Sequence, residues 1–115
     1  MKNQTQLELM IIIVERGYAD KIVDAINLFG HFPSIIRSKG TAPNEILSAL
    51  GIGEPYKDMI FCFCERKNVG LIYDILNNQF AMQEKKLGIA LTIPVSAVGG
   101  NVSLQILLGK TRNLF

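Results

Sequence analysis

The sequence contains no tryptophan, a single histidine and only two cysteines among its 115 residues. A structural zinc site needs about four Cys, His or carboxylate ligands, and a disulfide scaffold needs several cysteine pairs. Cys62 and Cys64 stand on one expected strand with Cα atoms roughly 6.6 Å apart, so a bridge between them would distort that strand. His31 lies far away in sequence. We therefore expect no metal site and no disulfide, and we expect both cysteines to be small buried residues.

Strong charge of one sign and long apolar runs are also missing. Twelve Lys and Arg stand against ten Asp and Glu, a net charge of +2, which argues against a nucleic-acid-binding protein with a basic face. The apolar run after Gln6 is short and is interrupted by Glu8, too brief for a secretory signal or a membrane span. We therefore expect a cytoplasmic protein that forms a single domain over residues 1–115.

What the sequence does contain is one pattern that occurs twice: a β-rich apolar run, an amphipathic helical stretch and a second β-rich run. The segments are Leu9–Val14, Tyr18–Phe29 and Ser34–Arg37, and then Met59–Cys64, Val69–Phe80 and Ile89–Pro94. A duplicated β-α-β unit predicts an α+β, ferredoxin-like fold, in which a four-stranded antiparallel sheet carries both helices on one face. The other face would be apolar and uncovered, which favours assembly of several copies.

Apolar residues recur at three-to-four spacing in both expected helices, and these stripes should face the core. The stripe residues are Ala19, Ile22, Val23, Ile26 and Phe29, and then Val69, Ile72, Leu76 and Phe80. Gly30 is expected to end the first helix in a left-handed conformation, with His31 as a solvated residue beyond it. Alternating apolar residues from Val102 to Leu108 predict an additional edge strand at the C-terminal end.

The connection from Lys39 to Asp58 is longer than two adjacent strands require, which points to a functional segment. Within it, Glu45–Leu50 is expected to form a short amphipathic helix. Lys39 beside Gly40-Thr41 offers a hydroxyl and backbone amides at a helix start, an anion site in principle. Lys85-Lys86 ahead of Gly88 could meet phosphate or could be a solvated basic doublet.

These features together resemble the PII nitrogen regulatory proteins. The resemblance lies in the opening strand and helix, Lys39-Gly40 at the end of the second strand, the long connection, and Gly88 before a strand that ends at Pro94-Val95. It implies a homotrimer that binds an adenine nucleotide in clefts between subunits. In that family the long loop changes shape to bind or release a target protein such as a transporter or a metabolic enzyme.

The sequence departs from the family at its charged positions. Gly40-Thr41-Ala42 lacks the second glycine of the family, and Ile89 replaces a basic residue that contacts phosphate. Gly100 and Val102 fall at or near two family arginines, while Cys62 and Asp58 align with a carboxylate and a lysine that line the cleft. Most of the charged nucleotide contacts of the family are therefore absent, and the chain resembles a divergent PII-like protein.

The sequence thus predicts a PII-like signalling protein that binds a small metabolite, such as an adenine nucleotide, at intersubunit clefts and reports through residues 41–57. The alternative is a trimeric interaction or scaffold protein that has lost nucleotide binding. We expect no catalytic residues and no catalytic cofactor, because no acid/base pair or nucleophile constellation is visible. The predicted ligand-binding residues are Ser34, Lys39, Gly40, Thr41, Cys62, Cys64, Lys85, Lys86, Gly88 and Ile89.

Overall fold

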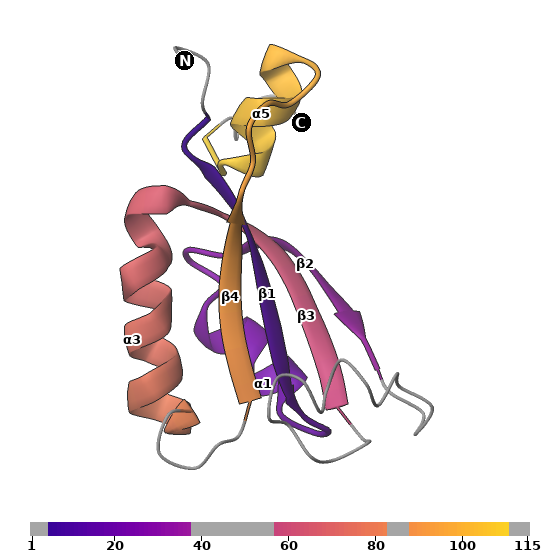
Figure 1. The fold of residues 1–115 in the computed structure, drawn as a ribbon, viewed down its shortest axis with the longest axis vertical. Coiled ribbons are helices and arrows are strands. Elements are labelled where there is room, and N and C mark those ends of the chain that lie inside the picture. The colour runs from indigo at the N-terminus through magenta and orange to yellow at the C-terminus, as the bar shows by residue number, and fades with distance from the viewer. Residues whose placement is uncertain (1–4, 38–56, 83–87, 111–115) are drawn as a thin grey trace.

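A computed structural model describes residues 5–37, 57–82 and 88–110 of the chain. These residues form four strands, three α-helices and one short 3-10 helix (Figure 1). In order they are β1 (Leu7–Glu15), α1 (Ala19–Ala25), β2 (His31–Ile36), β3 (Lys57–Glu65), η1 (Arg66–Asn68), α3 (Val69–Phe80), β4 (Gly88–Pro94) and α5 (Asn101–Leu107). Within these described ranges, no helix has the length and apolar character needed to cross a membrane.

The strands form one antiparallel sheet in the order β2-β3-β1-β4. Figure 1 shows α1 and α3 beside this sheet, and residues of both helices pack in one hydrophobic cluster with residues of β1 and β3. The predicted ferredoxin-like arrangement is therefore confirmed. The second predicted helix has the bounds that its periodicity indicated, Val69–Phe80.

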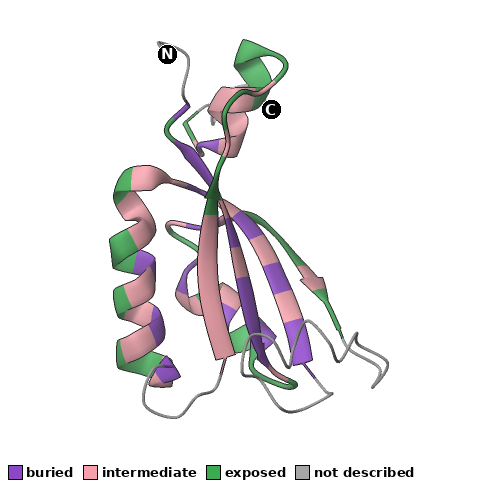
Figure 2. Cartoon of the chain, viewed as in Figure 1, coloured by how far each residue is buried: buried purple, intermediate pink, exposed green. Residues whose placement is uncertain are grey.

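The helix-covered face of the sheet carries the core. Strand alternation places every second residue of β1 and β3 on this face, where α1 and α3 bury them (Figure 2). The fully or nearly fully buried side chains include Met10, Ile12, Val14, Ile22, Ile26, Ile60, Ile72 and Leu76. Each such side chain contributes about 1.5–3 kcal/mol through burial. Both apolar stripes predicted from the sequence belong to this cluster.

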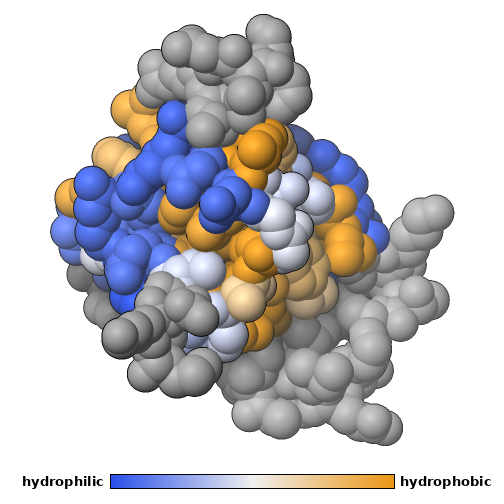
Figure 3. All heavy atoms as spheres, turned by 90° about the horizontal axis from the view of Figure 1, so that it is seen from above, coloured by the Kyte–Doolittle hydropathy of each residue, from blue (hydrophilic) through white to orange (hydrophobic). Residues whose placement is uncertain are grey.

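The opposite face, which we call the open face, is apolar as well, and neither α1 nor α3 packs on it. The register pairs its residues across three strands: Leu9, Ile11 and Ile13 of β1 with Phe63, Phe61 and Met59 of β3, and with Ile93, Leu91 and Ile89 of β4. Ile36 on β2 and Ile93 on β4 are exposed by 56% and 46%. Viewed from the α5 end, hydrophobic residues run through the middle of the molecular surface and hydrophilic residues gather on one side (Figure 3).

An ion pair closes one end of the sheet. The Glu8 carboxylate on β1 accepts a 2.8 Å hydrogen bond from Nε of Arg66, and Nη2 of the same arginine donates to the Thr5 carbonyl at 3.0 Å. Thr5 donates in turn from its hydroxyl to the carbonyl of Val95, just after β4. The Glu8 side chain is only 6% exposed. These contacts join the chain before β1 to the ends of β3 and β4.

The first helix is shorter than predicted, because α1 ends at Ala25 and a turn over Ile26–Phe29 completes the segment. The prediction that Gly30 adopts a left-handed conformation is wrong, since the positive φ values of described glycines fall elsewhere. Gly30 instead allows a close approach: a Cβ there would lie 3.1 Å from Sγ of Cys62. The prediction for His31 is also wrong, because this residue begins β2 and is half-buried.

The predicted C-terminal edge strand is wrong. Residues 101–107 form α5, which follows a sharp turn at Gly100 with φ +113°. Leu104, Leu107 and Leu108 are also spaced as on one helix face, so the same apolar residues fit a helix once the turn has led the chain away from β4. The segment then reaches the far edge of the sheet. A Cβ on Gly109 would lie 2.5 Å from Nε2 of His31, and Lys110 pairs with Glu65 at 3.4 Å.

Candidate functional site

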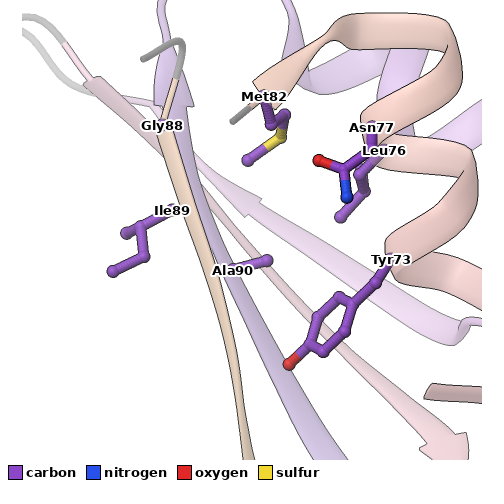
Figure 4. Close-up of a pocket in the computed structure, with 7 residues that line it drawn as sticks. All are labelled: Tyr73, Leu76, Asn77, Met82, Gly88, Ile89 and Ala90. Carbon is purple, nitrogen blue, oxygen red and sulfur yellow. The ribbon is translucent and has the colours of Figure 1, made fainter. Parts of the chain in front are cut away.

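A hollow of about 300 Å³ lies between α3 and the edge strand β4. It is lined by Tyr73, Leu76 and Asn77 of α3, by Met82 just beyond that helix, and by Gly88, Ile89 and Ala90 of β4 (Figure 4). A volume of this size stands at the lower end of the range for small-molecule pockets. The hollow is the candidate functional site of the described residues.

The hollow exists because β4 carries small residues on the side that faces α3. Gly88 and Ala90 alternate with Ile89, and Figure 4 shows the Ala90 side chain turned toward α3 while Ile89 points away to the other side of the strand. Gly88 cannot be replaced without moving β4, because a Cβ there would lie 1.9 Å from the carbonyl oxygen of Ile13. The short side chain of Ala90 thus leaves space that the larger side chains of α3 do not fill, while the missing side chain of Gly88 lets β4 approach β1.

The turn after α3 completes the wall of the hollow. Ala81 ends the helix in a left-handed conformation, with φ 51°, and its N–H bonds to the carbonyl of Asn77. This turn brings Met82 back toward the sheet, where it is 6% exposed and joins the core cluster. The position of Met82 therefore depends on a backbone conformation that an alanine adopts at some cost.

Among the residues that the structure describes, the lining is mostly apolar and contains no charged side chain. Two polar groups are present, the carboxamide of Asn77 and the phenol of Tyr73, and in Figure 4 the Asn77 carboxamide is turned toward β4. Within residues 5–37, 57–82 and 88–110, no hydrogen bond is found for this side chain. A pocket with apolar walls and one carboxamide suits an uncharged group that offers a hydrogen-bond donor and acceptor.

Of the ligand-binding residues predicted from the sequence, two line the hollow: Gly88 and Ile89. Ser34 lies on β2, at the opposite edge of the sheet, and is exposed. One subunit therefore does not bring Ser34 to Gly88, although neighbouring subunits could do so in an assembly. The remaining basic and loop candidates, Lys39, Gly40, Thr41, Lys85 and Lys86, lie outside the described residues, as does the segment 41–56.

Cys62 and Cys64 are core residues, as their positions on one face of an expected apolar strand predicted. Both are buried on the helix-covered face, outside the hollow, and their thiols are free. Burial raises the pKa of Cys62 to about 11, and burial together with the nearby Cys62 and Glu8 raises that of Cys64 to about 12. The described residues also contain no group of three or more His, Cys, Asp and Glu that could hold a metal.

Asp58, which aligns with a cleft residue of the PII family, is buried as well. It is 1% exposed, and one of its carboxylate oxygens accepts a 3.4 Å hydrogen bond from the backbone N–H of Gly17. Gly17 has a positive φ of 99° in the turn between β1 and α1. The carboxylate thus supports this turn from the start of β3, and its position is not in the hollow.

Sequence reasoning missed five lining residues of the hollow: Tyr73, Leu76, Asn77, Met82 and Ala90. Leu76 was assigned to the core stripe, which it also joins. A signal for the site was present in the alternation of Gly88 and Ala90 on the face of β4 that looks toward α3. Small residues opposite a helix predict a gap, but no pattern in the sequence indicates which side of the helix would border that gap.

Comparison with solved structures shows which known proteins share this fold. No protein family and no curated protein matches the sequence. Among solved structures, CPII from Thiomonas intermedia K12 bound to ADP, AMP and acetate matches with a TM-score of 0.63 at 15% identity, over 89% of this chain and 93% of that chain. PII from Arabidopsis thaliana bound to citrate matches with a TM-score of 0.59 at 12% identity, over 86% of each chain.

A second structure of CPII, a nitrogen regulatory PII-like protein, was solved with ADP, AMP and bicarbonate. It matches with a TM-score of 0.56 at 16% identity, over 82% of this chain and 94% of that chain. At such identities the likeness is one of fold. The chain has the fold of the PII-like proteins, and the resemblance found in the sequence is confirmed at this level.

Proposed function

We propose that this protein is a PII-like cytoplasmic signalling protein, a homotrimer that binds a small metabolite such as an adenine nucleotide at clefts between its subunits. The observation that carries the proposal is the match of the fold to PII-like proteins over most of both chains. Those structures hold ADP and AMP with acetate or bicarbonate, or citrate. The hollow beside β4 gives this chain a place for part of a comparable ligand.

Assembly follows from the open face. Ile11, Phe61 and Leu91 form one row across three strands, on the side of the sheet where neither α1 nor α3 packs. Apolar residues that continue across several strands of an uncovered sheet face are typical of protein interfaces. A closed trimer would cover it with the same face of other copies. In such an assembly the β2 edge of one subunit, with Ser34, would lie near the β4 edge of the next, with Gly88 and Ile89.

The proposed output of the protein is a change in the segment 41–57, which would bind or release a target protein such as a transporter or a metabolic enzyme. The role is one of binding and not of catalysis, and no nucleic acid is involved. Ligand binding should therefore alter hydrogen exchange in residues 41–56 more than in the core strands β1 and β3. Equal protection of this segment with and without ligand would contradict a reporting role.

Two measurements test the proposal. Sedimentation equilibrium at micromolar concentration should give the mass of a trimer. A thermal-shift screen should include ATP, ADP, AMP, adenosine, bicarbonate and citrate, since a ligand present at a hundredfold its Kd adds about 2.7 kcal/mol to the free energy of unfolding. A monomer that none of these compounds stabilises would overturn the proposal.

The second candidate function is a trimeric scaffold without ligand binding. It is favoured by the positions that the sequence aligns with cationic residues of the PII family. Ile89 turns its side chain to the far side of β4, and Val102 lies 56% exposed on α5. Neither can replace a cationic phosphate contact, which is worth about 1.5–3 kcal/mol. A trimer that responds to no compound of the screen would favour the scaffold.

A further inference from the structure

We infer that the hollow between α3 and β4 receives one uncharged planar ring of the ligand, that the Asn77 carboxamide reads the edge of this ring, and that the charged groups of the ligand stay outside. The inference rests on the proposed function, since it concerns the same ligand. It adds which part of the ligand enters the subunit and which residue selects it.

The shape of the hollow favours a flat group. Leu76 and Met82 border it from the helix side and Ala90 from the strand, so a ring that enters between α3 and β4 has apolar contacts on both of its faces. At about 300 Å³ the space suits one ring system more readily than a whole nucleotide. Most of the binding free energy would therefore come from the ring.

The carboxamide of Asn77 supplies the selectivity. It presents a donor and an acceptor side by side, it is turned toward β4, and the described parts of the chain contain no hydrogen-bond partner for it. Asparagine pairs in two hydrogen bonds with a ring edge that carries an adjacent donor and acceptor, as adenine does at N6 and N7. Hypoxanthine presents two adjacent acceptors, O6 and N7, on the corresponding edge, so pairing of the carboxamide with that edge leaves one of these bonds unmade.

The lining also indicates which groups of the ligand must stay outside the hollow. The seven lining residues that the structure describes are uncharged, and a phosphate or carboxylate buried among them without a cation or several donors is strongly unfavourable. Charged groups of the ligand therefore remain at the open side of the hollow, in water or beside a neighbouring subunit. Added phosphates should change the affinity much less than a change in the ring does.

The experiment uses adenosine, inosine, ADP and ATP as calorimetric probes of the unchanged protein and three variants. Asn77→Leu removes the carboxamide, and Ala90→Leu fills the hollow from the strand side. Asn78→Leu is the matched control, because Asn78 is the next residue of α3 and is exposed. Circular dichroism and the Tm of each variant establish that it is folded.

We expect adenosine to bind the unchanged protein about tenfold more tightly than inosine. Asn77→Leu should weaken adenosine about tenfold and abolish its advantage over inosine, and Ala90→Leu should weaken both nucleosides. Asn78→Leu should leave both affinities within about twofold. Adenosine, ADP and ATP should bind the unchanged protein with affinities within about tenfold of one another.

The possible failures are distinguishable. If adenosine and ADP bind the unchanged protein and all three variants equally, the ring lies elsewhere, and the inference is overturned while the proposed function stands. If no nucleoside or nucleotide binds but citrate or bicarbonate stabilises the trimer, the inference again fails and metabolite binding stands. If no compound binds, both the inference and the proposed metabolite binding are overturned.

Discussion

The two faces of the sheet have nearly the same chemistry and different surroundings. Ile11 and Ile12 are neighbours on β1, yet Ile12 lies at 0% exposure under α1 and α3, while Ile11 lies half-buried on the open face. Composition alone does not distinguish the two. The helices therefore account for the apolar character of one face only, and the apolar character of the second face is explained by a partner that covers it.

The two faces of the sheet stabilise different levels of the structure. The helix-covered face stabilises the single subunit, because its side chains pack within one chain. The open face, under the proposed function, stabilises contacts between subunits. A change on one face should therefore affect folding, and a matched change on the other should affect assembly.

The largest expected effect is a contrast between Ile12→Lys and Ile11→Lys. In Ile12→Lys an ammonium group would be buried among apolar side chains, which costs several kcal/mol and should leave the chain largely unfolded. In Ile11→Lys the long side chain can reach water in the monomer, so the fold should survive, while three like charges would meet in a trimer. Circular dichroism measures the fold, and sedimentation equilibrium measures the mass.

Either of two results would break this contrast. Unfolding of Ile11→Lys as complete as that of Ile12→Lys would mean that the open face is needed for the fold of each subunit. A trimer of Ile11→Lys at micromolar concentration would instead remove the open face from the proposed interface. Ile11→Val and Ile12→Val serve as controls, because each removes about one methylene group and should cost only about 0.5–1.5 kcal/mol.

A smaller effect is expected at the end of the covered face, where Glu8 pairs with Arg66. Arg66→Met keeps much of the apolar stem but leaves a buried carboxylate without its cation, which we expect to lower the free energy of unfolding by about 2–4 kcal/mol. The double variant Glu8→Gln, Arg66→Met removes the uncompensated charge and should recover part of that loss. Urea unfolding of the two variants measures the difference. Equal destabilisation of both would show that the packing of Arg66 matters and its charge does not.

The smallest effect concerns the two thiols of the covered face. Because burial raises the pKa values of Cys62 and Cys64 from 9.0 to about 11 and about 12, the folded chain keeps both thiols neutral at a pH where the unfolded chain ionises them. Their contribution to stability is present below about pH 9 and is lost as the pH rises through 11 and 12. The slope is at most about 1.4 kcal/mol per pH unit for each thiol.

The measurement is urea unfolding between pH 8 and pH 11, with the double variant Cys62→Ala, Cys64→Ala as the control. The variant should be less stable at pH 8 but should lose less stability as the pH rises. If the free energies of unfolding of the two proteins fall in parallel as the pH rises, water reaches these thiols on the covered face and burial does not raise their pKa values. Slow alkylation of the folded protein by iodoacetamide at pH 8 would agree with buried thiols.

Much of the fold was predictable because the duplicated pattern is strong. Val69–Phe80 combines a 3.6-residue period with clear ends, and Ile60, Cys62 and Cys64 alternate with larger residues that face the other way. The C-terminal segment was not predictable, because Val102–Leu108 fits both a strand and a helix. The decision depends on the turn at Gly100 and on contacts of Gly109 with His31, which are distant in sequence.

The candidate site was less predictable than the fold. Gly88 and Ile89 were identified through their place before and within the last strand, and both line the hollow. Asn77 was missed because a polar residue near the end of an amphipathic helix is ordinarily solvated. Its importance arises only when α3 is set against the small residues of β4, and that depends on tertiary packing which no local pattern encodes.

The strand order carries a consequence for how the chain reaches its fold. Of the four described strands β1 is synthesised first, yet both of its neighbours in the sheet, β3 and β4, come from after the long connection. Until these emerge from the ribosome, the segment from Leu9 to Val14 has high β propensity, no charge and no partner, the character of an aggregation-prone sequence. Expression of a fragment that stops before β4 should therefore yield insoluble material, and chaperones that hold extended apolar segments should act on this strand first.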